Sequence, residues 1–241
     1  MIEAKTDRIP WSRTANEAVC RRRIGEQHDA LYLLAKRVID IVCSIVLLVL
    51  LSPVLMVMAL AIRLDSRGPA VFRQTRVGKF GREFTMVKFR SMFAEADEGV
   101  HRQFAREYIN GRNHTSPSSG VGQPVYKPNG DKRITRVGKW LRRTSLDELP
   151  QLLNVLRGEM SLVGPRPAVP YEVAEYSNWH LQRLAVQPGL TGLAQISGRS
   201  GLTFEKIVRL DLQYIRRRSL ALDLRILLGT IPVVLKAKCA G

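Results

Sequence analysis

The sequence is poor in the residues and motifs that mark the commonest metal and nucleotide sites. Its three cysteines, Cys20, Cys43 and Cys239, are far apart, none forms a C-x-x-C pair, and its four histidines are equally scattered. This spacing argues against a zinc site and a disulfide framework, and it favours a reduced, cytosol-facing location. The phosphate loops G-x-x-x-x-G-K-S/T and G-x-G-x-x-G are missing, as is the G-x-S-x-G element. The familiar nucleotide-binding folds are therefore not expected.

Acidic side chains are also scarce. The 241 residues include 38 lysines and arginines but only 21 acids, so the net charge is +17. Such a balance indicates an anionic partner: nucleic acid, anionic lipid or a phosphorylated substrate. Because 45% of the residues are hydrophobic, the chain as a whole is not a disordered basic tail. Its length fits one large domain, or a small domain with appendages.

One long apolar run stands out near the N-terminus. Between Val38 and Ile62 the only ionisable side chains are Asp40 and Cys43. At about 1.5 Å per residue, a helix of this length could cross the apolar core of a bilayer. Basic residues flank both ends: Arg21, Arg22, Arg23, Lys36 and Arg37 before it, and Arg63, Arg67, Arg73, Arg76, Lys79 and Arg82 after it. Since positive residues mark the cytoplasmic side, both ends favour the same face of the membrane.

The dipeptide Ser52-Pro53 falls inside this run. Pro53 lacks a backbone donor and clashes with the preceding turn, so it bends or breaks a helix. A helix broken at Ser52-Pro53 could enter the cytoplasmic leaflet and return to the same face. An ordinary kinked span and a buried core helix are the alternatives, and charge and proline alone leave all three open.

The remaining pattern predicts an α+β fold, mainly helical. We expect three parts: a basic N-terminal arm over residues 1–30, a re-entrant membrane helix over 31–64, and a cytosolic catalytic domain over 65–241. Val71–Arg76 and Glu83–Arg90, separated by Gly78–Gly81, predict a small β-hairpin. We predict helices over 95–109, 171–185, 204–218 and 222–238, and an exposed loop over 110–130. The last helix is apolar around much of its circumference, which suits either a membrane interface or a buried core.

An adjacent pair of carboxylates, Asp147 and Glu148, is surrounded by basic residues. Ser145 and Glu148 form an S-x-x-E pattern that predicts a capping box at a helix start. Asp147 would then lie in the first helical turn, where the helix dipole favours negative charge. The simpler interpretation is that Glu148 only caps the helix and Asp147 only offsets its dipole.

Phosphate chemistry is the alternative role for this pair. A carboxylate attacks phosphorus only when both negative charges are neutralised, which requires a divalent cation and basic side chains. Mg²⁺ prefers oxygen ligands and commonly binds one or two carboxylates plus substrate phosphates. Asp147 and Glu148 are the candidate metal ligands. The candidate neutralising groups are Lys88, Arg90, Arg142 and Arg166; each could equally be a solvated or lipid-facing charge.

Five stretches together resemble the bacterial sugar transferase family, the monotopic phosphoglycosyl transferases that start exopolysaccharide and O-antigen assembly. They are KRVIDIVCSIVLLVLLSPV, GPAVFRQTRVGKFGREFTMVKFRSM, RITRVGKWLRRTSLDELPQLLNVLRGEMSLVGPRP, QPGLTGLAQISGRS and LDLQYIRRRSLALDLRILLGTIPVVL. They cover nearly everything from Lys36 to Leu235. No single stretch is specific, but the set is.

The resemblance implies transfer of a sugar 1-phosphate from a UDP-sugar to undecaprenyl phosphate, with release of UMP. It makes Asp147 the nucleophile, which would hold the phosphosugar as an acyl phosphate. Glu148 would bind or orient Mg²⁺ or assist proton transfer. In the C-terminal part, the chain is more similar to the members that use glucose or galactose, which makes these the expected sugars.

The resemblance also implies roles for matching residues around the pair. Lys88, Arg142, Pro165 and Arg166 are expected to bind phosphate and nucleotide, with Gln195 and Arg199 of QISGRS as weaker candidates for the same pocket. Ser52-Pro53 matches the break that makes the family's membrane helix re-entrant. The N-terminal multipass region of some larger relatives is not found, so a minimal catalytic form is expected.

The resemblance further implies a bacterial inner-membrane protein with its catalytic domain facing the cytoplasm. The expected partners are the UDP-sugar, undecaprenyl phosphate and anionic membrane lipids, with no nucleic acid; a homodimer is the oligomeric state the family implies. Two rival functions remain: a non-enzymatic basic module at the membrane surface, and a membrane-bound nucleotide-sugar hydrolase that uses water in place of the lipid. An acidic pair inside a basic field counts against the first, because it would repel a polyanion.

Overall fold

A computed structural model describes residues 30–93, 99–110, 133–198 and 201–235. The N-terminal arm, almost all of the 110–130 loop, Arg199 and the last six residues lie outside the described residues. In chain order, the elements are α2 (Ala30–Asp65), β1 (Val71–Val77), η1 (Lys79–Gly81), β2 (Glu83–Phe89), α3 (Gly99–Ile109), α4 (Arg136–Thr144), η2 (Leu146–Gln151), α5 (Leu152–Arg157), β3 (Ser161–Val163), α6 (Pro170–Val173), α7 (Asn178–Leu181), η3 (Gln182–Ala185), β4 (Gly189–Thr191), α8 (Leu193–Ile196), α9 (Phe204–Arg217) and α10 (Leu220–Leu235). The predicted mainly helical α+β fold is confirmed.

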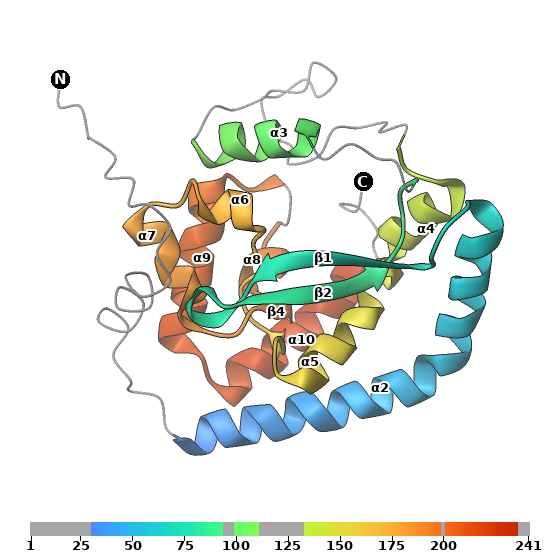
Figure 1. The fold of residues 1–241 in the computed structure, drawn as a ribbon. Helices are drawn as coiled ribbons and strands as arrows, with labels where there is room; N and C mark the ends of the chain where they lie inside the picture. Colours follow the sequence, from blue (N-terminus) through green and yellow to red (C-terminus); the bar gives the residue numbers. More distant parts are fainter. Residues whose placement is uncertain (1–29, 94–98, 111–132, 199–200, 236–241) are drawn as a thin grey trace.

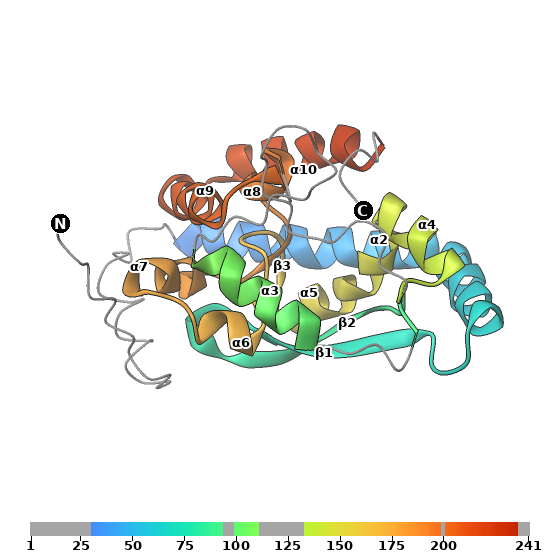
Figure 2. The same cartoon turned by 90° about the horizontal axis from the view of Figure 1, so that it is seen from above.

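The elements form a layered domain with a long helix along its edge. The β1–β2 hairpin lies on one side, α9 and α10 lie on the other, and α5 and β3 lie between them (Figures 1 and 2). The main core is apolar and draws on all of these layers. Its most deeply buried members include Val77, Val155, Met160, Val208, Ile215 and Ile226. This core holds the strands and short helices that carry the candidate site.

The β-hairpin forms as predicted. β1 and β2 pair antiparallel over their full length, from Val71 opposite Phe89 to Val77 opposite Glu83. Phe84 and Met86 are buried while Thr85, between them, is exposed, which is the alternation expected of a strand with one face on a core. The turn requires a left-handed backbone at Phe80, where φ is 56°. The hairpin thereby presents a defined set of side chains to the site.

A second sheet was not predicted from the sequence. β3 and β4 are three-residue strands that pair in parallel, with Ser161 opposite Gly189 and Val163 opposite Thr191. Glycines make this close approach possible. A Cβ on Gly189 would lie 2.0 Å from the Gly164 nitrogen, and one on Gly192 would lie 2.3 Å from the Gly164 carbonyl oxygen. The GPRP turn and the loop after β4 are therefore held in direct backbone contact.

α2 is one helix that runs in two directions. Figure 1 shows its first half running along the domain and its second half turning up beside α4. Pro53 is the proline inside it and accounts for the bend. Pro53 cannot donate to the Val49 carbonyl, and the Ser52 hydroxyl donates to that oxygen instead, at 2.8 Å. A serine before the proline thus satisfies a carbonyl that would be left without a partner in lipid.

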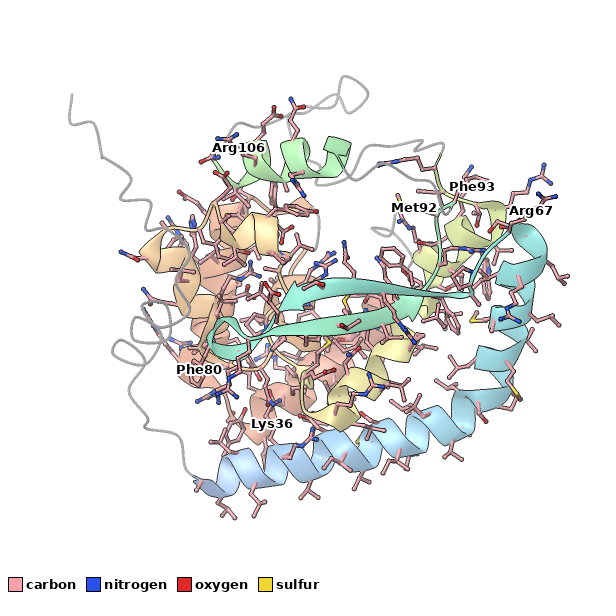
Figure 3. The ribbon with its side chains drawn as sticks, in the orientation of Figure 1. Lys36, Arg67, Phe80, Met92, Phe93 and Arg106 are labelled. Atoms are coloured by element: carbon pink, nitrogen blue, oxygen red, sulfur yellow. The ribbon has the colours of Figure 1, made fainter. Side chains whose placement is uncertain are left out.

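One face of α2 is tied to the domain by polar contacts. The Lys36 ammonium forms an ion pair with Asp223 at 2.9 Å, and Arg37 donates to the carbonyls of Val155 and Leu156 at 2.6 and 2.8 Å. Asp40 accepts from the backbone of Leu162 at 3.0 Å. Lys36 lies on the inner side of α2 in Figure 3, while most side chains of this half point outward.

The opposite face of α2 is apolar and exposed. Of the 18 consecutive residues that make up its most apolar stretch, only 11% are buried. The side chains of Val49, Leu50 and Met56 are each more than 65% exposed. A core helix of a soluble domain would bury this face. Among the described residues, α2 is the one helix long and apolar enough to cross a membrane.

Two local predictions were wrong. Ser145 does not cap the helix that follows it: it has a left-handed backbone with φ 58°, ends α4, and is followed by a 3₁₀ segment rather than an α-helix. Pro150 has no N–H to donate in an α-helical pattern, which explains the change. The predicted helix over 171–185 is instead three short helices. Ser177 starts the second by accepting a hydrogen bond from the His180 backbone at 3.4 Å, which interrupts a continuous helix.

Gly138 allows α4 to approach the chain after β2. The Thr135 hydroxyl caps α4 by accepting from Gly138 N at 2.9 Å, and a Cβ on Gly138 would lie 2.1 Å from the Ser91 carbonyl oxygen. We expect Gly138→Ala to lower the free energy of unfolding by about 2 kcal/mol, because backbone must move to admit the methyl group. Thermal unfolding measures this. Gly229→Ala is the matched helical control, since its Cβ would meet only the Ile196 side chain; equal melting temperatures would contradict the prediction.

Candidate active site

Asp147 lies in a buried position at the start of η2, directly after the chain reverses at Ser145. Its side chain is 8% exposed, and η2 packs between α4 and the inner strand β2. Leu146 packs against the cluster formed by α2 and α4, which includes Ile62 and Leu141. The tight left-handed turn and this apolar anchor hold the Asp147 carboxylate in place. A buried carboxylate requires compensating positive charge.

Four cationic side chains supply that charge. The pKa of the Lys88 ammonium is lowered to about 8: burial is the largest cause, the charges of three arginines act in the same direction, and the carboxylate of Asp147 acts in the opposite one. The arginines are Arg76, Arg142 and Arg166. Because the interaction between charges weakens with distance, we take Lys88 and the four side chains that act on it as one candidate site. They come from β1, β2, α4, η2 and the turn after β3.

Two of these cations, Arg142 and Lys88, are positioned by contacts within the site. The Arg142 Nε donates to the Ser91 hydroxyl at 2.8 Å, which directs its guanidinium from α4 toward the end of the hairpin. The Lys88 ammonium lies 5.2 Å from the centre of the Phe72 ring, its cross-strand neighbour. Arg142 and Asp147 thus lie near enough to Lys88 for their charges to act on it.

Arg76 is a member of the site that the sequence analysis missed. It is buried, and its guanidinium donates to the Pro167 carbonyl at 2.9 Å and to the Gln74 side chain at 2.8 Å. The alternation of side chains along β1 could have identified Arg76. Phe72, Gln74 and Arg76 share a face of β1, and Phe72 pairs with Lys88, so Arg76 projects from the same face of the hairpin as Lys88.

The GPRP turn lies beside this cluster. Gly164 donates to Thr191 O at 2.9 Å, and Gly189 donates to Pro165 O at 2.8 Å, so backbone bonds from both sides fix the turn that carries Arg166. Behind it, Arg183 forms a buried ion pair with Asp211 at 2.7 Å and reaches the Arg166 carbonyl at 3.5 Å.

Gln195 lies at the edge of the same turn. Its side-chain oxygen is buried and has no hydrogen-bond partner within the described part of the chain, and it lies 2.7 Å from the Cβ position of Gly192, which itself contacts Gly164. A buried acceptor of this kind suits a ligand that donates a hydrogen bond, such as a sugar hydroxyl or a base N–H. Arg199 lies outside the described residues.

Arg90 lies in another environment. It is 5% exposed, and its guanidinium donates to the carbonyl and hydroxyl oxygens of Ser66 at 2.7 and 2.9 Å. These bonds tie β2 to the end of α2. The charges that act most on the pKa of Lys88 are those of Arg76, Asp147, Arg142 and Arg166, and the charge of Arg90 is not one of them. A phosphate-binding role for Arg90 stays a prediction.

The site offers few protein ligands for a metal ion. Within the described residues there is no group of three or more histidine, cysteine, aspartate or glutamate side chains that could hold one. Asp147 and Glu148 supply two adjacent carboxylates, and Glu148 is only partly buried. This donor set fits Mg²⁺, which takes one or two carboxylates and completes its coordination with substrate phosphates and water.

A buried carboxylate among four cations, on a domain joined to an exposed apolar helix, is typical of an enzyme site for phosphorylated groups. The family model described as "Bacterial sugar transferase" matches residues 31–237, and the chain belongs to this family.

Three relatives are similar along most of this chain. An undecaprenyl-phosphate glucose phosphotransferase of Komagataeibacter xylinus is 44% identical over 225 residues, covering 88% of this chain and 37% of the relative. An undecaprenyl-phosphate galactose phosphotransferase of Salmonella typhimurium is 40% identical over 201 residues, covering 83% and 40%. A UDP-glucose:undecaprenyl-phosphate glucose-1-phosphate transferase of Caulobacter vibrioides is 42% identical over 210 residues, covering 84% and 70%. The chain spans about two fifths of the length of the first two.

Proposed function

We propose that the protein transfers a sugar 1-phosphate from a UDP-sugar to undecaprenyl phosphate and releases UMP. The observation that carries this proposal is the buried Asp147 carboxylate in the combined field of Lys88, Arg76, Arg142 and Arg166. The named activities of the relatives support the two substrates, and their glucose and galactose names favour a hexose without an acetamido group.

In the first step, an Asp147 oxygen attacks the sugar-bearing phosphorus of the UDP-sugar. A bond forms from carboxylate oxygen to phosphorus, the bridging P–O bond breaks, and the electron pair leaves with UMP. The enzyme then holds the sugar phosphate as an acyl phosphate. In the second step, an oxygen of undecaprenyl phosphate attacks the same phosphorus, the acyl oxygen leaves, and Asp147 is again a carboxylate.

The cations make the first attack feasible. An anionic nucleophile approaching a diphosphate meets strong repulsion, and preorganised positive charges lower that cost most where charge develops in the transition state. Lys88 and Arg142 come from β2 and α4, and Arg142 is held there by its bond to Ser91. Arg166 belongs to the GPRP turn, and Arg76 is bonded to that turn at the Pro167 carbonyl. The phosphates would therefore be bound from two directions.

Glu148 and Asp147 would hold Mg²⁺, which supplies further charge neutralisation on the phosphate oxygens. Glu148 follows Asp147 in η2 and is more accessible to solvent, so it can contact a ligand without giving up buried packing. Removal of divalent cations with a chelator is therefore expected to stop UMP release, and added Mg²⁺ to restore it.

The direct test is an assay of UMP release by the membrane-reconstituted protein with UDP-glucose, UDP-galactose and UDP-N-acetylglucosamine, with and without undecaprenyl phosphate. We expect sustained release only with the lipid acceptor and with glucose or galactose as the sugar. Equal release without the acceptor, together with free sugar phosphate, would identify a hydrolase and contradict the proposal.

The pKa of Lys88 predicts a pH dependence. With a pKa of about 8, the ammonium is charged below pH 8, so kcat/KM for the UDP-sugar is expected to fall by about tenfold per pH unit above it. Because the unfolded lysine titrates near 10.4, the folded chain binds fewer protons between these values, and the free energy of unfolding rises from pH 8 to about 10.5. Lys88→Arg keeps its charge and should lose the kinetic break; an unchanged profile would contradict this assignment.

We propose that α2 is re-entrant, with both ends on the cytoplasmic face of the bacterial inner membrane. The bend at Pro53, the Ser52 bond to Val49 O and basic residues at both ends support it. The test is labelling of Leu31→Cys and Leu64→Cys, both exposed, in a variant without native cysteines. An impermeant maleimide should reach both positions from the cytoplasmic side only; labelling from opposite sides would show a crossing helix.

A further inference from the structure

Two adjoining cavities lie on the α9–α10 side of the molecule, away from the Asp147 site. Their volumes are about 340 and 460 Å³, and Gln213 and Arg217 line both. Trp179 and Arg209 contribute to the first, and Arg225 to the second. Figure 2 shows α9 and α10 on the side opposite β1 and β2, so this groove belongs to another face than the outer surface of the hairpin.

The polar wall of the groove is cationic. Arg209, Arg216, Arg217 and Arg225 line it, and none of the described residues that line it is acidic. Within the described residues, Arg209 has one ion pair, at 3.6 Å with exposed Glu205, and Arg216, Arg217 and Arg225 have none. Four guanidinium groups around one groove, three of them without an ion pair among the described residues, favour an anionic ligand.

The floor and the adjoining surface are apolar. Leu222 and Ile226 of α10 and Ile196 of α8 line the second cavity. Next to Arg225, α10 exposes a row of side chains at helical spacing: Leu224 and Leu228, each 57% exposed, and Ile231, 55% exposed. A free anion has no apolar surface to pack against this row, and a nucleic acid would place its polar backbone against it. An acyl chain fits it.

We propose that this groove binds the phosphate headgroup of an anionic phospholipid, with Arg217 and Arg225 contacting the phosphate and the acyl chains lying along Leu224, Leu228 and Ile231. The lipid site is separate from the site of sugar transfer. It rests on the membrane association in the proposed function, but not on the covalent chemistry. The groove would seat α9 and α10 on anionic patches of the membrane.

Trp179 provides a reporter at the groove. In a Trp11→Phe/Trp140→Phe variant it is the one tryptophan left of three. The full chain is reconstituted in two sets of vesicles of identical phosphatidylcholine and phosphatidylglycerol content. In one set, the phosphatidylglycerol has brominated acyl chains. In the other set, an equal amount of the phosphatidylcholine has brominated acyl chains and the phosphatidylglycerol has none. We expect half-maximal quenching at about a thirtyfold lower fraction of brominated phosphatidylglycerol, because each of the two contacting arginines contributes roughly 1 kcal/mol.

Arg217→Gln/Arg225→Gln should remove this preference, while Arg82→Gln/Arg102→Gln should keep it. The control pair is exposed, lies on other elements and removes the same charge. Equal quenching by both lipids, survival of the preference without Arg217 and Arg225, or equal loss in the control pair would overturn the proposal. The proposal would also be overturned if inorganic phosphate or a single-stranded oligonucleotide removed the preference for phosphatidylglycerol, because that would identify a general anion site. A protein that shows the preference but releases no UMP would refute the proposed function and leave the lipid site standing.

Discussion

Asp147→Asn is expected to abolish UMP release, lowering kcat/KM for the UDP-sugar by about three orders of magnitude or more. An amide oxygen is too weak a nucleophile to attack the phosphorus, so no acyl phosphate forms. The substitution is nearly isosteric in a buried position and keeps one oxygen. It also removes a charge that favours the ammonium form of Lys88, so the pKa of Lys88 should fall further. UMP release and the Lys88 titration are both measurable.

The control for this variant is Glu83→Gln, which makes the same acid-to-amide change at an exposed position of β2 and should keep full activity. Asp147→Asn should also keep its membrane association, because the polar contacts of Lys36, Arg37 and Asp40 that hold α2 on the domain do not involve Asp147. Near-normal turnover by the Asn variant would rule out a covalent intermediate on Asp147.

Lys88→Met has the second-largest expected effect, a loss of about 10² to 10³ in kcat/KM. The methionine fills similar space beside the Phe72 ring but removes the one ammonium group of the cluster. The carboxylate and the diphosphate would then face each other with one positive charge fewer, in a site from which water is partly excluded. Steady-state kinetics of UMP release measure the loss.

Lys139→Met is the matched control, since it removes the same charge from an exposed position on α4. It should change kcat/KM by less than about twofold. Lys88→Arg should retain more activity than Lys88→Met because it keeps the positive charge. If the Met variants of Lys88 and Lys139 had the same activity, Lys88 would be a surface charge with no part in the reaction.

Local pattern predicted the hairpin. Segments rich in β-branched and aromatic residues on either side of Gly78–Gly81 predicted strands over Val71–Arg76 and Glu83–Arg90, close to the observed bounds. The resemblance, and not local pattern, proposed Asp147, Lys88 and Arg142 as site residues. Arg76 was missed because its role depends on which residues pair across the hairpin. That register is set by tertiary packing as well as by the turn.

The elements that sequence reasoning missed depend on distant contacts. β3 and β4 are too short for a periodicity, and they pair only because Gly164 and Gly189 let two backbones meet. The left-handed Ser145 is stabilised where α4 ends and η2 packs against β2, which no local rule foresees. By contrast, the bend in α2 follows from the chemistry of Pro53 alone, and the Ser52 hydroxyl adds the hydrogen bond that makes it tolerable in lipid.

The central claim is that Asp147 carries the sugar phosphate between two half-reactions. Its most direct test is the intact mass of the protein after mixing with the UDP-sugar, without undecaprenyl phosphate, followed by an acid quench. We expect an adduct of one hexose phosphate, mapped by proteolysis to the peptide containing Asp147, released on adding the lipid phosphate and absent from Asp147→Asn. An unmodified mass from a preparation that turns over rapidly when both substrates are present would contradict the claim.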